Sequence, residues 1–276
     1  MIGAGIVTYN PEIGLLERNI KMIIDQVDEV IIVDNASENK KELEKISQKY
    51  NVLVLYNDIN QGIANALNRL METFENMHYQ WVLTLDQDTL CPENLITMLK
   101  RYAEENVGII SPQFINRNAE RKKDKVLNDV EKVEWTITSA SLTNVTAWRV
   151  VDGFDDDLFI DGVDTDFGIR LNKAGYFVIK VNTISISHKI GNSFVKTICG
   201  HQFLIQNHNA FRKYYIARNT IIVDKKNYGR RRLLLAYMKV FKQFLLVVFF
   251  EREKKQKIQA ILQGVRDSEK YFRGQL

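Results

Sequence analysis

The chain begins with the stretch Ile2-Gly3-Ala4-Gly5-Ile6-Val7-Thr8-Tyr9-Asn10-Pro11, from which the rest of the fold can be worked out. Its apolar part predicts a buried strand, and Asn10-Pro11 predicts the turn that ends it. Because proline is favoured at the first position of a helix, a helix is expected to follow. Apolar residues then recur at helical spacing at Leu16, Ile20, Ile23, Ile24 and Val27.

The same alternation of strand and helix continues to residue 85. Strands are expected at Val30–Val33, Val52–Leu55 and Trp81–Leu85, with helices around Leu43–Tyr50 and Ile63–Phe74. Strands that alternate with helices of about 10 to 15 residues predict βαβ units. The expected fold class is therefore α/β, with a Rossmann-like, mostly parallel central sheet flanked by helices. Such sheets bind ligands beyond the carboxyl ends of their strands.

Regular structure is also expected in the second half of the chain, although the pattern is looser. A helix is expected over Pro92–Tyr102, a strand at Gly108–Ser111 and a charged mobile loop over Asn116–Lys132. Regular structure is expected again over Val133–Leu142. A helix that ends near Lys173-Ala174-Gly175 should follow, and then two strands at Tyr176–Val181 and Ile184–Ser187. No strand pattern is found from His201 onward.

Composition places the chain among globular proteins. Of its 276 residues, 45% are hydrophobic and 26% are charged, which excludes collagen-like, disordered and membrane-bundle classes. A formal net charge of +4 is too small to indicate a nucleic-acid-binding protein. Two cysteines, Cys91 and Cys199, cannot form a disulfide framework, so reduced thiols in a cytoplasmic protein are expected. The N-terminus does not read as a signal peptide.

Two carboxylates follow the fourth predicted strand, in Asp86-Gln87-Asp88. Carboxylates at such a position suit a hard cation, Mg²⁺ or Mn²⁺, that is bound partly by protein oxygens and partly by a substrate diphosphate. The alternative is an ordinary turn after a strand, where aspartate is common.

A second acidic group lies in Phe159-Ile160-Asp161-Gly162-Val163-Asp164-Thr165-Asp166, before a predicted helix. One interpretation is a helix cap with Asp166 paired to Arg170 at the i,i+4 spacing. The other is an aspartate that accepts a proton from an attacking hydroxyl. His188 closes a predicted strand and is either a structural residue or a metal ligand. Asn60, Gly62 and Asn68 indicate either an anion site or an ordinary helix start.

Six motifs in order carry a resemblance to a known family. They are Ile6-Val7-Thr8-Tyr9-Asn10-Pro11, Val33-Asp34-Asn35, Asn60-x-Gly62-x-Ala64-x-Ala66-x-Asn68, Asp86-x-Asp88, Asp161-x-x-Asp164-x-Asp166-x-x-x-Arg170 and His188-x-x-Gly191. Together they resemble family 2 inverting glycosyltransferases of the GT-A fold. The Phe-Ile-Asp-x-Val-Asp-Thr-acidic pattern is most similar to that of bacterial rhamnosyltransferases that use dTDP-L-rhamnose.

The resemblance implies a role for each motif. Binding of the nucleotide-sugar is implied for Thr8, Tyr9, Asn10, Asp34, Asn60, Gly62 and Asp86. Metal binding is implied for Asp88 and His188, and the role of general base for Asp164. The acceptor side is implied for Asp161, Asp166 and Ser139. The family often has an arginine where this chain has Leu67.

The implied activity is a metal-dependent inverting transfer of L-rhamnose to a saccharide acceptor, lipid-linked or oligosaccharide, in bacterial surface polysaccharide synthesis. Two alternatives stay open: another donor such as a UDP-hexose, and a non-catalytic nucleotide-binding scaffold on a membrane surface. The implied domains are a GT-A domain over residues 1–220, with a nucleotide-sugar half over 1–90 and an acceptor half over 91–220, and a helical tail over 221–276.

The tail contains the apolar segment Leu233–Phe250, interrupted by Lys239, Lys242 and Gln243. Its longest uncharged apolar run, Phe244–Phe250, is shorter than the span needed to cross about 30 Å of hydrocarbon. A basic amphipathic helix is therefore expected, which would hold the protein peripherally on the cytoplasmic face of the cell membrane. The alternatives are a packed helix pair and a homodimer interface.

Overall fold

The computed structural model describes residues 1–116, 128–188, 194–198, 201–205 and 207–274, and the chain divides into two compact units. The first, here the sheet unit, comprises Met1–Ile115, Asp124–Phe159 and Val163–Ser187. The second, here the helical unit, comprises Asn116–Lys123, Ile160–Gly162 and His188–Leu276. The boundary expected at residue 220 falls inside a helix of the helical unit.

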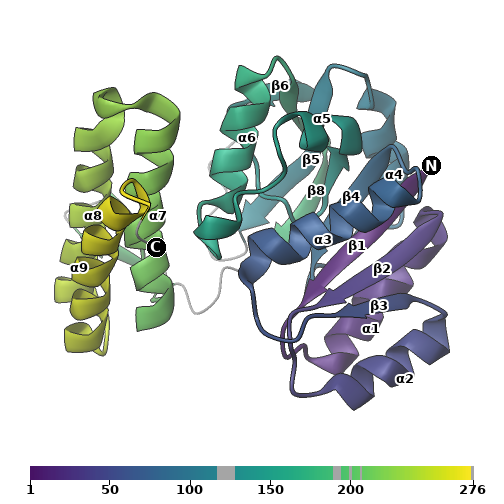
Figure 1. Ribbon diagram of the computed structural model, residues 1–276, viewed down its shortest axis with the longest axis horizontal. Helices are drawn as coiled ribbons and strands as arrows, with labels where there is room; N and C mark the ends of the chain where they lie inside the picture. The colour runs from purple at the N-terminus through teal and green to yellow at the C-terminus, as the bar shows by residue number, and fades with distance from the viewer. Residues whose placement is uncertain (117–127, 189–193, 199–200, 206, 275–276) are drawn as a thin grey trace. The chain divides into compact units, whose positions relative to one another are not determined.

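The sheet unit alternates strands and helices over its first half (Figure 1). Its elements are β1 (Ile2–Thr8), α1 (Ile13–Ile23), β2 (Glu29–Asp34), α2 (Lys40–Tyr50), β3 (Leu53–Tyr56), α3 (Gly62–Asn76), β4 (Trp81–Asp86), α4 (Leu95–Leu99), β5 (Val107–Asn116), β6 (Val130–Val133), β7 (Ser141–Asn144), α5 (Val145–Val150), α6 (Val163–Lys173) and β8 (Phe177–His188). Short 3₁₀ turns occur at Ile24–Gln26, Lys100–Tyr102 and Asp156–Leu158.

These strands form one sheet in the order β3-β2-β1-β4-β7-β5-β8-β6. β1 pairs in parallel with β2 and β4, and β2 pairs in parallel with β3, as predicted from the βαβ pattern. β7 is antiparallel to β4 and β5, and β6 is antiparallel to β8. The register pairs Thr8 with Asp34 and Val7 with Asp86, so three polar strand ends lie together at one edge.

The two faces of β1 differ because its residues alternate. Ile2, Ala4 and Ile6 lie in a core that α1, α2 and α4 complete. On the other face, α3 crosses the sheet (Figure 1). A Cβ atom at Gly3 would lie 2.1 Å from the Phe74 ring, and one at Gly5 would lie 2.1 Å from Leu70. The glycines are therefore needed for the close approach of α3 to the central strand.

Cys91 is a free thiol inside this core. Burial raises its pKa to about 12, so the thiol is protonated at neutral pH and packs as an apolar group. The other cysteine, Cys199, lies outside the described residues.

Several predicted elements differ from the structure. The two strands expected at Tyr176–Val181 and Ile184–Ser187 are one continuous strand, β8. It does not break at Asn182, because the Asn182 backbone N–H donates to Asp129 O and the neighbouring Val181 pairs with Val130 of β6. Most of the loop expected over 116–132 lies outside the described residues, and β6 already begins at Val130.

Helix boundaries were also shifted. α1 begins at Ile13, with Glu12 as its N-cap, so Pro11 precedes the helix and does not occupy its first position. The helix expected over Pro92–Tyr102 is only α4 followed by a 3₁₀ turn. The prediction that no strand follows His201 is wrong, since β9 (Phe194–Ile198) and β10 (His201–Ile205) pair as an antiparallel hairpin.

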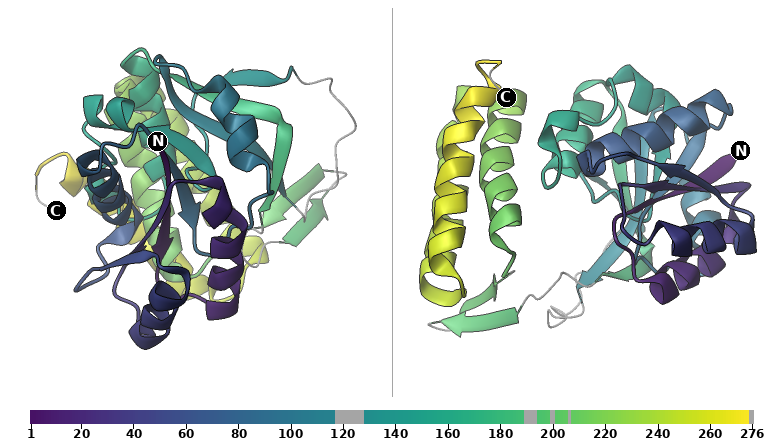
Figure 2. Two further views of the ribbon diagram at one scale, coloured as in Figure 1. Left: turned by 90° about the vertical axis from the view of Figure 1, so that its right-hand side faces the viewer. Right: turned by 60° about the horizontal axis from the view of Figure 1, so that its bottom comes forward.

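The helical unit also contains three long helices where the sequence analysis expected one amphipathic segment. They are α7 (Ala210–Tyr228), α8 (Arg230–Phe250) and α9 (Lys254–Tyr271), and they lie side by side (Figures 1 and 2). Small and apolar side chains fill the space between them, namely Ala217, Ile221, Ala236, Val240, Val247 and Ile261.

A buried ion triad also joins these helices. Lys213 Nζ lies 2.6 Å from one Glu251 carboxylate oxygen, and Lys257 Nζ lies 3.0 Å from the other. None of the three side chains is more than 5% exposed. Glu251 follows the last residue of α8, so one carboxylate joins the C-terminal end of α8 to both α7 and α9.

α8 is longer and more apolar than the sequence analysis allowed. It has 21 residues and a mean hydropathy of 1.9 over its most apolar window, which is enough by length and composition to cross a membrane. The prediction that this segment is too short is therefore wrong. The prediction considered only the uncharged run Phe244–Phe250. The helix continues through Lys239 and Lys242 and is about 31 Å long. Only 17% of that window is buried.

Candidate active site

Buried side chains of the sheet unit hold the Asp86-Gln87-Asp88 turn, at the end of β4, through hydrogen bonds to its backbone. Asn19 on α1 donates to Asp86 O at 2.9 Å, and the Asp86 N–H donates to Ser139 Oγ at 3.0 Å. Ser139 also shares a hydrogen bond of 2.6 Å with Thr89, and it is buried. Ser139, which was expected on the acceptor side, thus supports the turn from within the fold. Asp86 is half-buried, and Asp88 is exposed.

The side chain of Gln87, in the same turn, reaches across to the end of β1. Its Oε1 accepts a hydrogen bond of 2.8 Å from the Tyr9 N–H. The Tyr9 side chain is 50% exposed. An aromatic ring is therefore exposed to solvent at the carboxyl end of the central strand, which is where parallel sheets bind their ligands.

The carboxylate of Asp34 is fully buried at the end of β2. Oδ1 accepts from the Thr8 hydroxyl at 2.9 Å, and Oδ2 accepts from the Ser37 N–H at 2.9 Å. The Ser37 hydroxyl in turn accepts from the Asn10 N–H at 2.7 Å. Three residues were expected at the nucleotide: Thr8, Asn10 and Asp34. Thr8 binds Asp34 directly and Asn10 is connected to it through Ser37, which fixes the loops after β1 and β2.

The start of α3 is fixed by a network centred on Asn35. Its Nδ2 donates to Asn60 Oδ1 and to Gly62 O, both at 3.0 Å. Its Oδ1 accepts from Asn57 Nδ2 and from the Gln61 N–H, also at 3.0 Å. Asn35 belongs to one of the six motifs but was given no role of its own, and Asn57 was not singled out. Each of the two asparagines directly follows a strand, Asn35 after β2 and Asn57 after β3, and this position is the signal that could have identified them.

Gly62 brings α3 into contact with the acidic segment. The φ of Gly62 is +87°, and a Cβ there would lie 2.5 Å from Phe159 O. The same carbonyl accepts a hydrogen bond of 2.6 Å from the Ile63 N–H. Only glycine combines this left-handed backbone with so close an approach.

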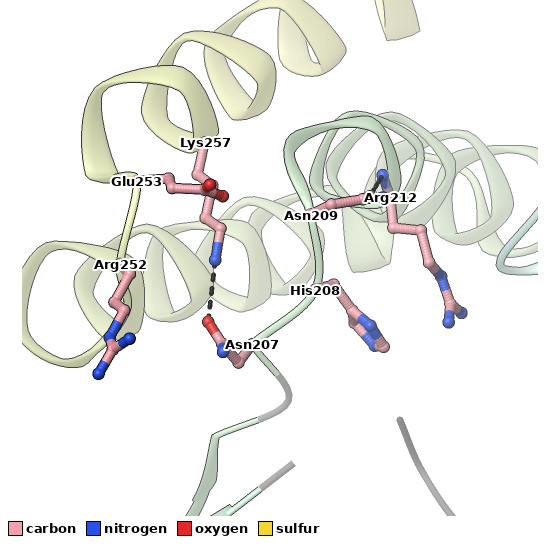
Figure 3. Close-up of a pocket in the computed structure, with 7 residues that line it drawn as sticks. All are labelled: Asn207, His208, Asn209, Arg212, Arg252, Glu253 and Lys257. Carbon is pink, nitrogen blue, oxygen red and sulfur yellow. Dashed lines mark hydrogen bonds between the residues drawn. The ribbon is translucent and has the colours of Figure 1, made fainter. Parts of the chain in front are cut away.

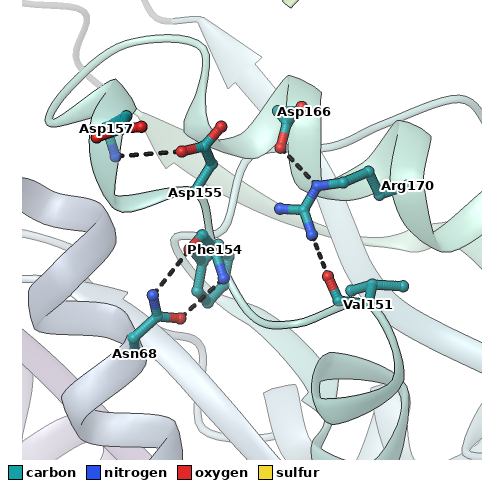
Figure 4. Close-up of polar contacts among 7 residues, drawn as sticks. All are labelled: Asn68, Val151, Phe154, Asp155, Asp157, Asp166 and Arg170. Atoms are coloured by element: carbon teal, nitrogen blue, oxygen red, sulfur yellow. Dashed lines mark hydrogen bonds and ion pairs between the residues drawn. The ribbon is translucent and has the colours of Figure 1, made fainter. Parts of the chain in front are cut away.

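Asn68, nearly two turns further along α3, clamps the segment that leads to the acidic residues (Figure 4). Its Nδ2 donates to Phe154 O at 2.8 Å, and its Oδ1 accepts from the Phe154 N–H at 2.8 Å. The same oxygen accepts from the Trp148 indole at 3.0 Å. This asparagine therefore acts as a structural partner of residues 148–156.

We expect Asn68→Ala to lower the free energy of unfolding by roughly 2–4 kcal/mol, because it leaves the Trp148 and Phe154 groups without a partner. Urea unfolding followed by circular dichroism measures this. The matched control is Asn65→Ala on the same helix, whose one hydrogen bond to Asp156 is exposed, and for which a change below about 0.5 kcal/mol is expected. Equal effects of the two variants would contradict the clamp.

Asp164 lies in the first turn of α6 and is half-buried. Its Oδ1 accepts a hydrogen bond of 2.8 Å from the Thr138 hydroxyl. The Thr138 carbonyl accepts from the Thr84 hydroxyl on β4 at 2.6 Å. Because the next residue, Ser139, holds the Asp86 N–H, adjacent residues of one segment contact both acidic groups. The structure thus brings together two motifs that are far apart in the sequence.

Asp166 has a different environment. The predicted i,i+4 pair is present, with Arg170 Nε 2.6 Å from Asp166 Oδ2, and the carboxylate has no exposed surface. Arg170 also donates to Val151 O (Figure 4). The ion pair orients Arg170, and the Arg170 hydrogen bond to Val151 links α6 to the segment that Asn68 clamps.

Asp161 belongs to the helical unit, where it forms an ion pair with Arg212 of α7. Arg212 lines a cavity of about 480 Å³ together with Asn207, His208, Asn209, Arg252, Glu253 and Lys257 (Figure 3). Burial lowers the pKa of His208 to about 4, and the nearby Arg212 charge adds to this, so the imidazole is neutral at pH 7. The sequence analysis did not predict this cavity.

A divalent cation fits the Asp86-Gln87-Asp88 turn only with help from a ligand. Among the described residues there is no group of three or more His, Cys, Asp or Glu that could hold a metal. The side chain of His188 lies outside the described part of the chain. Mg²⁺ and Mn²⁺ often take one or two protein carboxylates and complete their shell with substrate phosphates and water, so Asp88, with Asp86 beside it, matches that kind of site.

Residues 4–156 match the family described as Glycosyl transferase family 2. The chain belongs to this family. It is 30% identical to the dTDP-rhamnosyl transferase RfbF of Shigella flexneri over 288 aligned positions, which cover 96% of this chain and 95% of the relative. The predicted membership of family 2 and the predicted glycosyltransferase activity are both confirmed.

Two solved structures of glycosyltransferases share the fold. Residues 1–349 of S. aureus TarS, in complex with UDP-GlcNAc, have a TM-score of 0.62 at 13% identity, covering 99% of this chain and 92% of that TarS chain. The mannosyltransferase PcManGT from Pyrobaculum calidifontis, in complex with GDP-Man and Mn²⁺, has a TM-score of 0.58 at 15% identity, covering 97% of this chain and 74% of PcManGT. The predicted α/β fold of GT-A type, with a central sheet flanked by helices and a C-terminal helical part, is confirmed.

Proposed function

We propose that this glycosyltransferase moves L-rhamnose from dTDP-L-rhamnose to a saccharide acceptor, with inversion at the anomeric carbon and with Mg²⁺ or Mn²⁺ as cofactor. The relative RfbF, a dTDP-rhamnosyl transferase similar over nearly its whole length, supports the donor. The Mn²⁺ bound to PcManGT supports the metal. The observation that carries the proposal is the Thr138-Ser139 segment, which contacts the Asp164 carboxylate and the Asp86 backbone.

A single displacement at the anomeric carbon has two electrostatic requirements. The acceptor hydroxyl must lose a proton on one face of the sugar, and the departing diphosphate must be stabilised on the other. Asp164 would take the proton, with its carboxylate oriented by the Thr138 hydroxyl. A cation held by Asp88 would neutralise charge on the diphosphate.

The remaining residues would position the nucleotide-sugar. Tyr9 offers an exposed ring for the base. Thr8, Asn10, Asp34, Asn60 and Gly62 shape the loops around it through their mutual hydrogen bonds. The acceptor would be a lipid-linked or free oligosaccharide of a bacterial surface polysaccharide, glycosylated at the cytoplasmic face of the membrane. The alternative donor is a UDP-hexose.

Calorimetric titration of dTDP-rhamnose, UDP-galactose and UDP-N-acetylglucosamine, each with Mn²⁺ and with a chelator, tests donor and metal together. We expect binding of dTDP-rhamnose that is at least about tenfold tighter with Mn²⁺ than with the chelator. Asp88→Ala should remove most of this difference in affinity between Mn²⁺ and chelator. The control is Glu93→Ala, which removes one negative charge from an exposed residue five positions further along and should retain the difference. Tighter binding of a UDP-sugar would contradict the donor, and equal affinity with chelator would contradict the metal.

A further inference from the structure

The outer face of α8 carries a continuous apolar stripe. Its five residues are spaced four, three, four and four positions apart, so they lie on one side of the helix along its whole length. Their exposed fractions range from 37% to 72%. The stripe, as used below, consists of Leu234, Met238, Phe241, Leu245 and Phe249.

This stripe is not part of the core of the helical unit. α8 packs against α7 and α9 through a different side, which contains Ala236, Val240 and Val247. Contiguous exposed apolar surface of this kind is uncommon on soluble monomers and marks a binding surface.

The charge of the surrounding region points to an anionic partner. Residues 207–274 contain 17 Lys and Arg against 5 Asp and Glu, a formal net charge of +12, whereas residues 1–206 carry −8. Arg230, Arg231 and Lys242 are exposed on α8 itself, close to the stripe in the helical projection. A second copy of the helical unit would bring the same positive charge and would be repelled. An anionic lipid surface combines negative charge with an apolar interior.

We propose that α8 docks in the plane of an anionic bilayer, with the stripe inserted at the boundary between headgroups and acyl chains. This deepens the proposed location at the membrane and names the surface that makes the contact. Arg230, Arg231 and Lys242 then face the anionic headgroups, as in interfacial amphipathic helices.

The contacts of α8 favour this orientation over a helix that spans the membrane, although its length would allow it. Lys239 Nζ lies 2.7 Å from Asp224 Oδ2 of α7, and Glu251 at the end of α8 binds Lys213 and Lys257. A spanning α8 would have to break these ion pairs or carry them into hydrocarbon, and both are costly. An in-plane helix keeps them.

Co-sedimentation of the full chain with lipid vesicles tests the docking surface. We expect binding to vesicles of phosphatidylglycerol and phosphatidylethanolamine, and at least about tenfold weaker binding to pure phosphatidylcholine. The double variant Phe241→Ser/Leu245→Ser should lower binding to the anionic vesicles by at least about tenfold. The control is Val150→Ser in the sheet unit, which is similarly exposed and should bind like the unaltered chain.

Unchanged vesicle binding by the double variant would overturn the proposal. So would a stable dimer of the unaltered chain that the double variant converts to a monomer without any binding to vesicles, since the stripe would then be an interface between copies. Donor titration of the same double variant separates this question from the proposed activity. Retained donor affinity with lost vesicle binding confirms the docking surface, and lost affinity in both assays would indicate misfolding and contradict a surface role.

Orientation is tested with an environment-sensitive fluorophore on single cysteines, in a chain with Cys91→Ala and Cys199→Ala. In-plane docking predicts a clearly larger blue shift on vesicles for the label at Phe241→Cys, which enters the acyl-chain boundary, than for the label at the adjacent Lys242→Cys, which faces the headgroups. Blue shifts of equal size at both positions would mean that α8 is surrounded by hydrocarbon and would overturn the in-plane arrangement.

Discussion

Asp164→Asn is expected to lower the rate of sugar transfer by about 10²- to 10⁴-fold while leaving donor affinity unchanged. The amide keeps the shape of the carboxylate and can still accept the Thr138 hydrogen bond through its oxygen. It cannot take the proton of the acceptor hydroxyl at neutral pH. The measurements are turnover with dTDP-rhamnose and a saccharide acceptor, and calorimetric donor binding.

The matched control for this prediction is Asp157→Asn, an exposed aspartate in the 3₁₀ turn that precedes the same acidic segment. It removes the same charge and should retain nearly full turnover. Turnover of Asp164→Asn close to that of the unaltered chain would exclude Asp164 as the base. A parallel loss of donor affinity would assign it to binding and not to proton transfer.

Glu251→Ala is expected to destabilise the helical unit by about 3–5 kcal/mol, the largest stability effect among these variants. The substitution leaves Lys213 and Lys257 facing each other with almost no exposure to water and no carboxylate between them. It also removes the side chain that joins the end of α8 to α7 and α9. Thermal and urea unfolding followed by circular dichroism should show the loss in the helical signal.

The triple variant Lys213→Met/Glu251→Leu/Lys257→Met distinguishes buried charge from packing. Apolar side chains of similar size need no ion partner, so this variant should recover most of the lost stability. A loss of less than about 1 kcal/mol for Glu251→Ala would mean that water reaches the two lysines when the carboxylate is removed. Failure of the triple variant to recover stability would assign the role of Glu251 to its shape instead of its charge.

Much of the sheet unit could be predicted because its signals are local. β1 lies in the apolar stretch predicted for it and β4 has the predicted limits to within a residue, since continuous apolar runs between turn residues read directly as buried strands. The i,i+4 pair of Asp166 and Arg170 was predictable for the same reason, because helix geometry alone brings those side chains together. Errors arose where the local signal was ambiguous, as at Asn182, whose polar side chain concealed the continuity of β8.

The sequence by itself determined the order of strands and helices over residues 1–86, the acidic residues at the strand ends, and the family. These follow from periodicity and from motifs whose residues lie a few positions apart. Only the tertiary structure decided that α3 lies on the glycine face of β1, that Asn35 and Asn68 hold loops from distant parts of the chain, and that Ser139 is buried behind Asp86. It also decided which side of α8 is packed and which is exposed, because an apolar helix with two apolar sides gives no local sign of which one its neighbours cover.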